Sequence, residues 1–181
     1  MKRTRPSVAV IALLALGLIA LAGCRQQQQA PQPPRPQASR VPAAGAAVGR
    51  TAPDFTLTPF EGKAISLSSL KGKPVAVMFW TSTCHFCAQE APDLDALYRQ
   101  YKGQGLEVLG VGLDDPEALL QKAQQLKLTF PVGYNAQAGQ QYAISGVPHT
   151  FFIDRQGRIA ASLLGARPTI SGRGAGGCWR T

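Results

Sequence analysis

The chain has 181 residues, enough for one domain of ordinary size with its own hydrophobic core. Its 19 lysines and arginines outnumber its 10 acidic residues and give a net charge of +9, but seven of the basic residues fall within the first fifty positions. Residues 51–166 carry nine basic and ten acidic residues. This balance leaves no basic surface of the kind that binds DNA or RNA, so we expect no nucleic-acid partner.

The first 23 residues have the pattern of a secretory signal peptide: a basic start, MKRTR, then an apolar stretch that is short for a membrane span. The stretch ends in LAGC at Cys24, which resembles the lipobox where bacterial lipoproteins are cut and lipidated on cysteine. An uncleaved anchor helix and an ordinary signal peptide are the alternatives. We expect a lipid anchor on Cys24 that holds the domain on the extracytoplasmic, periplasmic side of a membrane. Arg25 is not the aspartate associated with inner-membrane retention, which favours the outer membrane over the inner one.

Residues 24–50 are rich in glutamine, proline and alanine and contain no aromatic residue. Such a composition cannot bury enough apolar surface to fold, so we predict a disordered tether. The folded domain is predicted to cover residues 51–166, and residues 167–181 to form a divergent tail rich in glycine and arginine.

Strands and helices alternate along the predicted domain. Residues 55–57 and 64–67 indicate an N-terminal hairpin, and the continuous apolar runs 74–80 and 106–113 are typical of strands buried on both faces. The order of all elements predicts an α/β fold with a central mixed sheet flanked by helices. The remaining elements are a helix that starts after an N-cap at Ser82 or Thr83 and is kinked at Pro92, a helix that opens with Asp115 and Pro116 and runs to Leu126, a short helix from Ala136 to Ala143, and a hairpin of residues 149–154 and 158–164.

Cys84 and Cys87 form a C-x-x-C pair directly after the first buried strand. Cys84 falls in the first turn of the predicted helix, where unpaired backbone N–H groups and the helix dipole favour a thiolate. Cys87 follows one turn later on the same face, within reach of a disulfide. Trp80 is expected to end the strand and to help cover the site. In a domain outside the cytoplasm, such a pair is a candidate redox centre.

Further motifs flank this pair in a fixed order. They are Ala52-Pro53-Asp54-Phe55, Leu67-Ser68-Ser69-Leu70-Lys71-Gly72-Lys73-Pro74, Phe79-Trp80, Cys84-His85-Phe86-Cys87, Glu90 with Pro92, Gly146-Val147-Pro148, and Phe152-Ile153-Asp154 ahead of Gly157. With these motifs the chain resembles the TlpA-type thiol–disulfide oxidoreductases, membrane-anchored relatives of thioredoxin. The resemblance implies a thioredoxin fold with an N-terminal β-hairpin extension. We expect the final amphipathic helix of these relatives to be missing or divergent in this chain.

The resemblance also implies roles for particular residues. Pro148 is expected in the cis form, facing the cysteines, although a proline here could simply begin a strand. Glu90 is expected to handle the proton of Cys87, the alternative being a solvent-exposed helix acid. The groove that receives a partner protein is expected to be lined by Trp80, His85, Phe86, Val147, Pro148 and His149.

The implied chemistry is thiol–disulfide exchange with partner proteins, without a cofactor beyond the Cys84–Cys87 disulfide itself. Cys84 attacks a partner disulfide as a thiolate, and Cys87 resolves the mixed disulfide. The reverse sequence would oxidise a dithiol, and a protonated His85 would favour that direction by stabilising the thiolate. Apocytochrome c, other envelope thiol proteins and a membrane electron donor are the partners that the resemblance implies, with a reductase favoured.

Two other activities fit part of the sequence. Cys84 and Cys87 with a nearby imidazole, His85 or His149, would suit Cu(I) or Zn(II), as in a metallochaperone, but the C-x-x-x-C spacing of copper-delivery relatives is absent. A peroxiredoxin-like peroxidase would place threonine three residues before the reactive cysteine, where Thr81 stands. It would also need proline seven residues before that cysteine, where the chain has Val77. We therefore expect no bound metal and favour disulfide exchange.

Cys178 is the remaining cysteine once Cys24 is lipidated and the other two are paired. It lies in the 167–181 tail, and a free thiol there could form adventitious dimers. No function is assigned to it.

Overall fold

The computed structural model describes residues 46–165. The predicted signal peptide, Cys24, most of the tether and the tail with Cys178 lie outside these residues. No helix within 46–165 has the length and apolar character needed to cross a membrane. The elements, in chain order, are β1 (Thr56–Leu57), β2 (Ile65–Ser66), the 3-10 helix η1 (Leu67–Leu70), β3 (Val75–Trp80), α2 (His85–Tyr101), the 3-10 helix η2 (Lys102–Gln104), β4 (Glu107–Gly112), α3 (Pro116–Gln125), β5 (Val132–Tyr134), α4 (Ala136–Gln141), β6 (His149–Ile153) and β7 (Ile159–Leu164).

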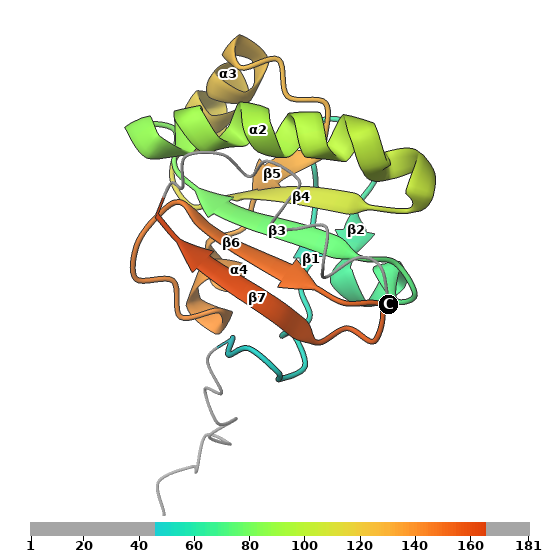
Figure 1. Cartoon of the computed structure of the whole chain (residues 1–181). Coiled ribbons are helices and arrows are strands. Elements are labelled where there is room, and N and C mark those ends of the chain that lie inside the picture. Colours follow the sequence, from blue (N-terminus) through green and yellow to red (C-terminus); the bar gives the residue numbers. More distant parts are fainter. Residues whose placement is uncertain (1–45, 166–181) are drawn as a thin grey trace, which may run out of the picture. The chain divides into compact units, whose positions relative to one another are not determined.

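Five strands form the central sheet in the order β5-β4-β3-β6-β7. Strand β3 pairs in parallel with β4 and antiparallel with β6, so the sheet is mixed, as predicted. The short strands β1 and β2 pair with each other as the predicted N-terminal hairpin. Figure 1 shows α2 running across β3 and β4 on one face, with α4 behind the sheet. This arrangement is the α/β thioredoxin fold that the sequence led us to expect.

The apolar run of β3 is buried along its entire length, because side chains on its two faces enter two different cores. Val75, Val77 and Phe79 join a core with the N-terminal hairpin and α4. The alternate residues, ending at Trp80, join a core under α2 and α3. The active cysteines therefore follow a strand that is held from both sides, which gives them a rigid base.

One local expectation is wrong and one element was missed. Helix α2 is capped by Cys84 rather than by Ser82 or Thr83. The helix continues through Pro92 to Tyr101, so the proline does not end it, as predicted. Strand β5 was not predicted because it has three residues with glycine in the middle, too few to show alternation. It forms because its residues pair in parallel with Gly110–Gly112 of β4. On the side of β5 away from β4, the N–H of Phe60 donates a hydrogen bond of 2.8 Å to Val132 O.

Candidate active site: a disulfide at the start of helix α2

Cys84 stands at the junction of β3 and α2. After Trp80 ends the strand, a turn is closed by a bond from Cys84 N–H to Thr81 O at 3.3 Å. Cys84 then acts as the N-cap of α2, and its sulfur accepts a hydrogen bond from Cys87 N–H at 3.1 Å. The sulfur of Cys84 thus lies against the free N–H groups at the positive end of the helix dipole. A thiolate on Cys84 would be stabilised in this position.

Cys84 and Cys87 form a disulfide, with Cα atoms 5.2 Å apart. Their exposure differs: Cys84 is partly exposed, whereas Cys87 is fully buried beneath α2. Only Cys84 can therefore be approached by the sulfur of another protein without local unfolding. The loop that this bond closes is too short to stabilise the fold strongly, since a disulfide removes more entropy from the unfolded chain when the loop is longer. The disulfide can therefore be reduced and re-formed at little cost to the stability of the domain.

Asp114 holds the loop that leads to Cys84. Its carboxylate accepts bonds from Ser82 N–H at 2.9 and 3.0 Å and from the Ser82 hydroxyl at 2.6 Å. Asp114 lies two residues after the end of β4, and β4 is the parallel neighbour of β3, so the two strand ends meet at this edge of the sheet. Ser82 is consequently not available as the helix cap that the sequence suggested. The sequence had not marked Asp114 as a site residue, since its partner is 32 positions away.

Glu90 is buried, with 4% of its surface exposed, and faces the sheet. The hydroxyl of Thr150 donates a hydrogen bond of 2.7 Å to its Oε1. Burial raises the pKa of Glu90; the Thr150 bond works against this rise, and the negative charge of Asp93 adds to it. The alternative of a solvent-exposed helix acid is therefore wrong. A buried carboxyl of raised pKa on the turn after Cys87 is suited to exchange protons with a neighbouring group.

The Val147–Pro148 peptide bond is cis, as the resemblance implied. Pro148 precedes β6, and its carbonyl accepts a hydrogen bond from Gly165 N–H at 2.8 Å, which ties the proline loop to the end of β7. Because β6 pairs with β3, this loop and the start of α2 lie at the same edge of the sheet, as Figure 1 shows.

His149 points away from Cys87. Side chains alternate along β6, and Thr150 faces α2, so His149 lies on the opposite face of the sheet. Its Nε2 is 2.7 Å from the hydroxyl oxygen of Ser162, and its ring stacks on Phe151 with centroids 4.2 Å apart. Burial lowers the pKa of His149. These contacts place the side chain of His149 away from the helix that carries the disulfide.

The other predicted groove residues divide into exposed and buried ones. Phe86 is 59% exposed and forms an edge contact with His85, whose Nε2 lies 3.1 Å from Gln89 Nε2 on the surface of α2. Both can meet a partner protein. Trp80 is 1% exposed and packs in the core with Cys87, so it supports the site from below. Its indole nitrogen has no hydrogen-bond partner within residues 46–165.

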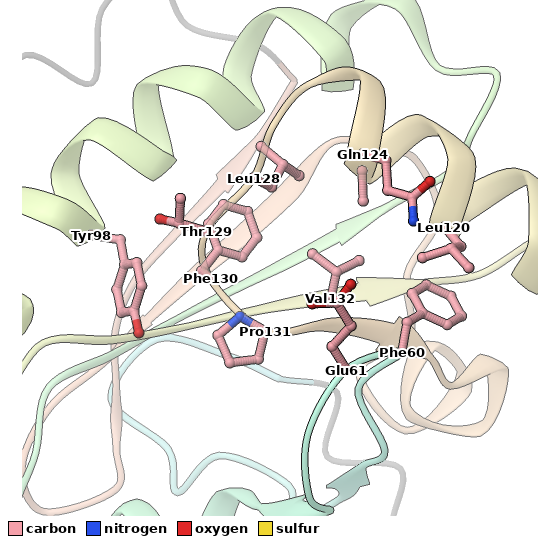
Figure 2. Close-up of a pocket in the computed structure, with 11 residues that line it drawn as sticks. Phe60, Glu61, Tyr98, Leu120, Gln124, Leu128, Thr129, Phe130, Pro131 and Val132 are labelled. Atoms are coloured by element: carbon pink, nitrogen blue, oxygen red, sulfur yellow. The ribbon is translucent and has the colours of Figure 1, made fainter.

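A cavity of about 240 Å³ opens at a different place, between the second half of α2, α3 and β5 (Figure 2). Figure 2 shows Phe60, Leu120 and Val132 around it, with the Tyr98 hydroxyl at one side. Tyr98 lies more than two helical turns beyond Glu90, so this hollow is not part of the disulfide site. Within the described part of the chain, no cluster of three or more His, Cys, Asp or Glu side chains could hold a metal ion.

A partly exposed cysteine at a helix N-terminus, joined to a buried one a turn later on a thioredoxin fold, defines the class of thiol–disulfide oxidoreductases. The comparisons agree. The AhpC/TSA family profile matches residues 48–162. The thiol-disulfide oxidoreductase ResA of Geobacillus kaustophilus (strain HTA426) is 38% identical over 122 residues, which cover 66% of this chain and 70% of that protein.

Two solved structures are also similar. The thioredoxin domain of a thiol-disulfide oxidoreductase from Bacteroides vulgatus is 30% identical with a TM-score of 0.61, over 66% of this chain and 90% of that one. A thiol:disulfide interchange protein from Bacteroides sp. is 30% identical with a TM-score of 0.59, over 64% of this chain and 80% of that one. The chain belongs to the AhpC/TSA family and within it is a TlpA-type, thioredoxin-like thiol–disulfide oxidoreductase.

Proposed function

We propose that the protein is a lipid-anchored reductase of the extracytoplasmic space, which reduces disulfides in partner proteins such as apocytochrome c before haem attachment, or other envelope thiol proteins. The observation that carries the proposal is the disulfide between partly exposed Cys84 and buried Cys87, beside the cis peptide at Pro148. The LAGC sequence at Cys24 and the signal-peptide pattern before it support the anchor, with the outer membrane favoured.

In the reaction that we propose, the protein enters as a dithiol. The Cys84 thiolate attacks one sulfur of a partner disulfide, forms a Cys84–partner bond and releases the other partner sulfur as a thiolate. Cys87 then loses its proton and attacks Cys84, which forms the Cys84–Cys87 disulfide and releases the second partner thiolate. Two electrons pass from the enzyme dithiol to the partner disulfide, and no cofactor beyond the cysteine pair takes part.

We assign to Glu90 the role of accepting the proton of the Cys87 thiol. A thiol is a poor nucleophile until it is deprotonated, and Cys87 has no surface exposed to bulk solvent. The Glu90 side chain lies one turn beyond Cys87 on the sheet-facing side of α2, and burial raises its pKa toward that of a useful base.

Partner docking is assigned to the edge that carries Cys84, Phe86 and the loop of Val147 and Pro148. Phe86 offers an exposed aromatic surface beside the reactive sulfur. After each turnover the Cys84–Cys87 disulfide must be reduced again, and we assign this step to a thiol-bearing electron donor in the membrane. The lipid anchor would keep the domain near such a donor.

The equilibrium reduction potential of the cysteine pair tests the direction of electron flow. The purified protein is equilibrated with dithiothreitol buffers, and the fraction of disulfide is read by thiol trapping and mass spectrometry. A value below about −230 mV is expected for a reductase. A value near or above about −150 mV would show an oxidant instead, with His85 as the first residue to replace. Failure to form the intramolecular disulfide would overturn the proposal and favour the metal site.

Trapping of partners tests the mechanism itself. A Cys87→Ser variant can form the mixed disulfide through Cys84 but cannot resolve it, so partner proteins should accumulate as covalent adducts that dithiothreitol releases. A Cys84→Ser variant is the matched control and should trap none, because Cys87 is fully buried. Equal trapping by both variants would contradict the assignment of Cys84 as the attacking residue.

A further inference from the structure

Thr150 connects the proline loop to the buried acid of α2. It is the second residue of β6, two positions after Pro148, and its side chain is fully buried on the face that α2 covers. Its hydroxyl donates to Glu90 Oε1 at 2.7 Å. This is the one hydrogen bond of the Glu90 carboxyl among residues 46–165.

A threonine hydroxyl can serve both protonation states of its partner. It donates to a carboxylate, and after rotation it accepts from a protonated carboxyl group. A buried carboxylate without such a donor would carry the full cost of lost hydration. Thr150 therefore keeps Glu90 hydrogen-bonded while it gains and loses a proton, and the bond that it donates favours the ionised form.

Few other charges act on Glu90. Asp93 on the same helix is the charged side chain whose field reaches it, and it opposes ionisation. The other side chains that the strands contribute to the core under α2 carry no titratable group: Ala76, Met78 and Trp80 on β3, Val108 on β4, Val132 on β5, Phe152 on β6, and Ala161 and Leu163 on β7. Cys87, when reduced, is the titratable neighbour on α2. His149 lies on the opposite face of the sheet, against Phe151 and Ser162.

We propose that Thr150 is the positioning residue of Glu90: its hydroxyl fixes the carboxyl group beneath α2 in the ionised form that accepts the proton of Cys87, and so sets the pH range in which the mixed disulfide is resolved. The inference rests on the proposed role of Glu90. Thr150 lies two residues after the cis-proline at the start of β6. This short segment therefore connects the loop that meets the partner to the residue that holds Glu90, the proton acceptor.

Single-turnover oxidation of the reduced full-length protein by a disulfide-containing peptide tests this. Quenching with acid at set times and mass spectrometry separate formation of the mixed disulfide from its resolution by Cys87. Replacing the Thr150 hydroxyl with a methyl group, Thr150→Val, should slow resolution about tenfold at pH 7 and move the midpoint of its pH profile upward, while the first step changes less than about twofold. Thr150→Ser keeps a hydroxyl and should restore the rate to within about twofold.

A matched control comes from another threonine–carboxylate pair on α2. The hydroxyl of Thr129 donates to the equally buried Asp95 at 2.8 Å, five residues after Glu90 and so about one and a half turns nearer the end of the helix. Thr129→Val removes a comparable bond, so it should leave the pH profile of resolution unchanged. A shift as large as that of Thr150→Val would overturn the proposal, because the effect would then come from loosening α2.

Glu90→Gln separates this inference from the proposed function. Loss of a general base costs on the order of 100-fold, so Glu90→Gln should slow resolution by about that factor. Adding Thr150→Val to it should slow resolution no further. If Glu90→Gln resolves at the normal rate, the proposed role of Glu90 fails and this inference with it. If Glu90→Gln is slow but Thr150→Val is normal, or Thr150→Ser is as slow as Thr150→Val, only the role of Thr150 is overturned.

Discussion

Replacing Asp114 with alanine should both destabilise the domain and loosen the loop before Cys84. The carboxylate of Asp114 accepts three hydrogen bonds from Ser82, of which only 8% is exposed. Without this carboxylate, the N–H and O–H groups of the buried Ser82 lose their hydrogen-bond acceptor, and little solvent can replace it. Each hydrogen bond to a charged group contributes about 1.5–3 kcal/mol, and the three share one partner, so their contributions are not additive.

We therefore expect Asp114→Ala to cost about 3 kcal/mol in the free energy of unfolding. Asp114→Asn keeps one acceptor oxygen and should cost about 1.5 kcal/mol, and Ser82→Ala, which removes only the hydroxyl, about 1 kcal/mol. Urea unfolding of the oxidised protein, followed by circular dichroism, measures these differences. The neighbouring Asp115 is the control, since its removal changes the charge equally. It caps α3 through longer bonds of 3.3 and 3.4 Å, so Asp115→Ala should cost about 1 kcal/mol.

Hydrogen exchange shows whether the loss is local to the site. In Asp114→Ala the backbone N–H groups of Ser82 and Cys84 should exchange faster, because the turn that they close has lost its anchor. Asp115→Ala should leave the exchange of this turn unchanged. If Asp114→Ala is no less stable than Asp115→Ala, or if the turn exchanges equally in both, the reasoning that Asp114 holds the loop before Cys84 is refuted.

Three further changes probe the core and the pH dependence of stability. Leu94→Ala removes a fully buried side chain of α2 and should cost about 2–5 kcal/mol by urea unfolding, and a cost below about 1 kcal/mol would show that the helix is not firmly packed on the sheet. A methyl group on Gly112 would lie 2.8 Å from Leu119 Cδ2, so Gly112→Ala should cost about 1–3 kcal/mol, and Leu119→Ala in the same chain should recover part of it. Burial lowers the pKa of His149, so as the pH falls the unfolded chain takes up a proton there before the folded protein does. The free energy of unfolding should therefore decrease as the pH drops below about 6.5. The His149→Gln variant should lack this part of the pH dependence. An unchanged pH profile in that variant would contradict the assignment.

The sequence alone determined the fold and the reactive pair, because the signals for both are local. Strand β3 was recognisable since six successive residues enter two cores, a pattern that shows as a continuous apolar run. The start of helix α3 was recognisable from Asp115 and Pro116, whose capping chemistry acts within one turn. The spacing of Cys84 and Cys87 was enough to predict the disulfide that the structure contains.

Only the tertiary structure decided how the surroundings of that pair are arranged. Ser82 is a good N-cap by propensity, but it hydrogen-bonds to Asp114 in the loop after β4, and Cys84 caps the helix instead. The sequence allows Glu90 to be either a solvent-exposed acid of the helix or an acid of the active site. Which of the two it is depends on its contact with Thr150, sixty residues further along the chain. These outcomes depend on contacts between segments that are distant in sequence. A pattern within one segment carries no information about which strand will lie beside it, and the protein's proton chemistry is set by those neighbours.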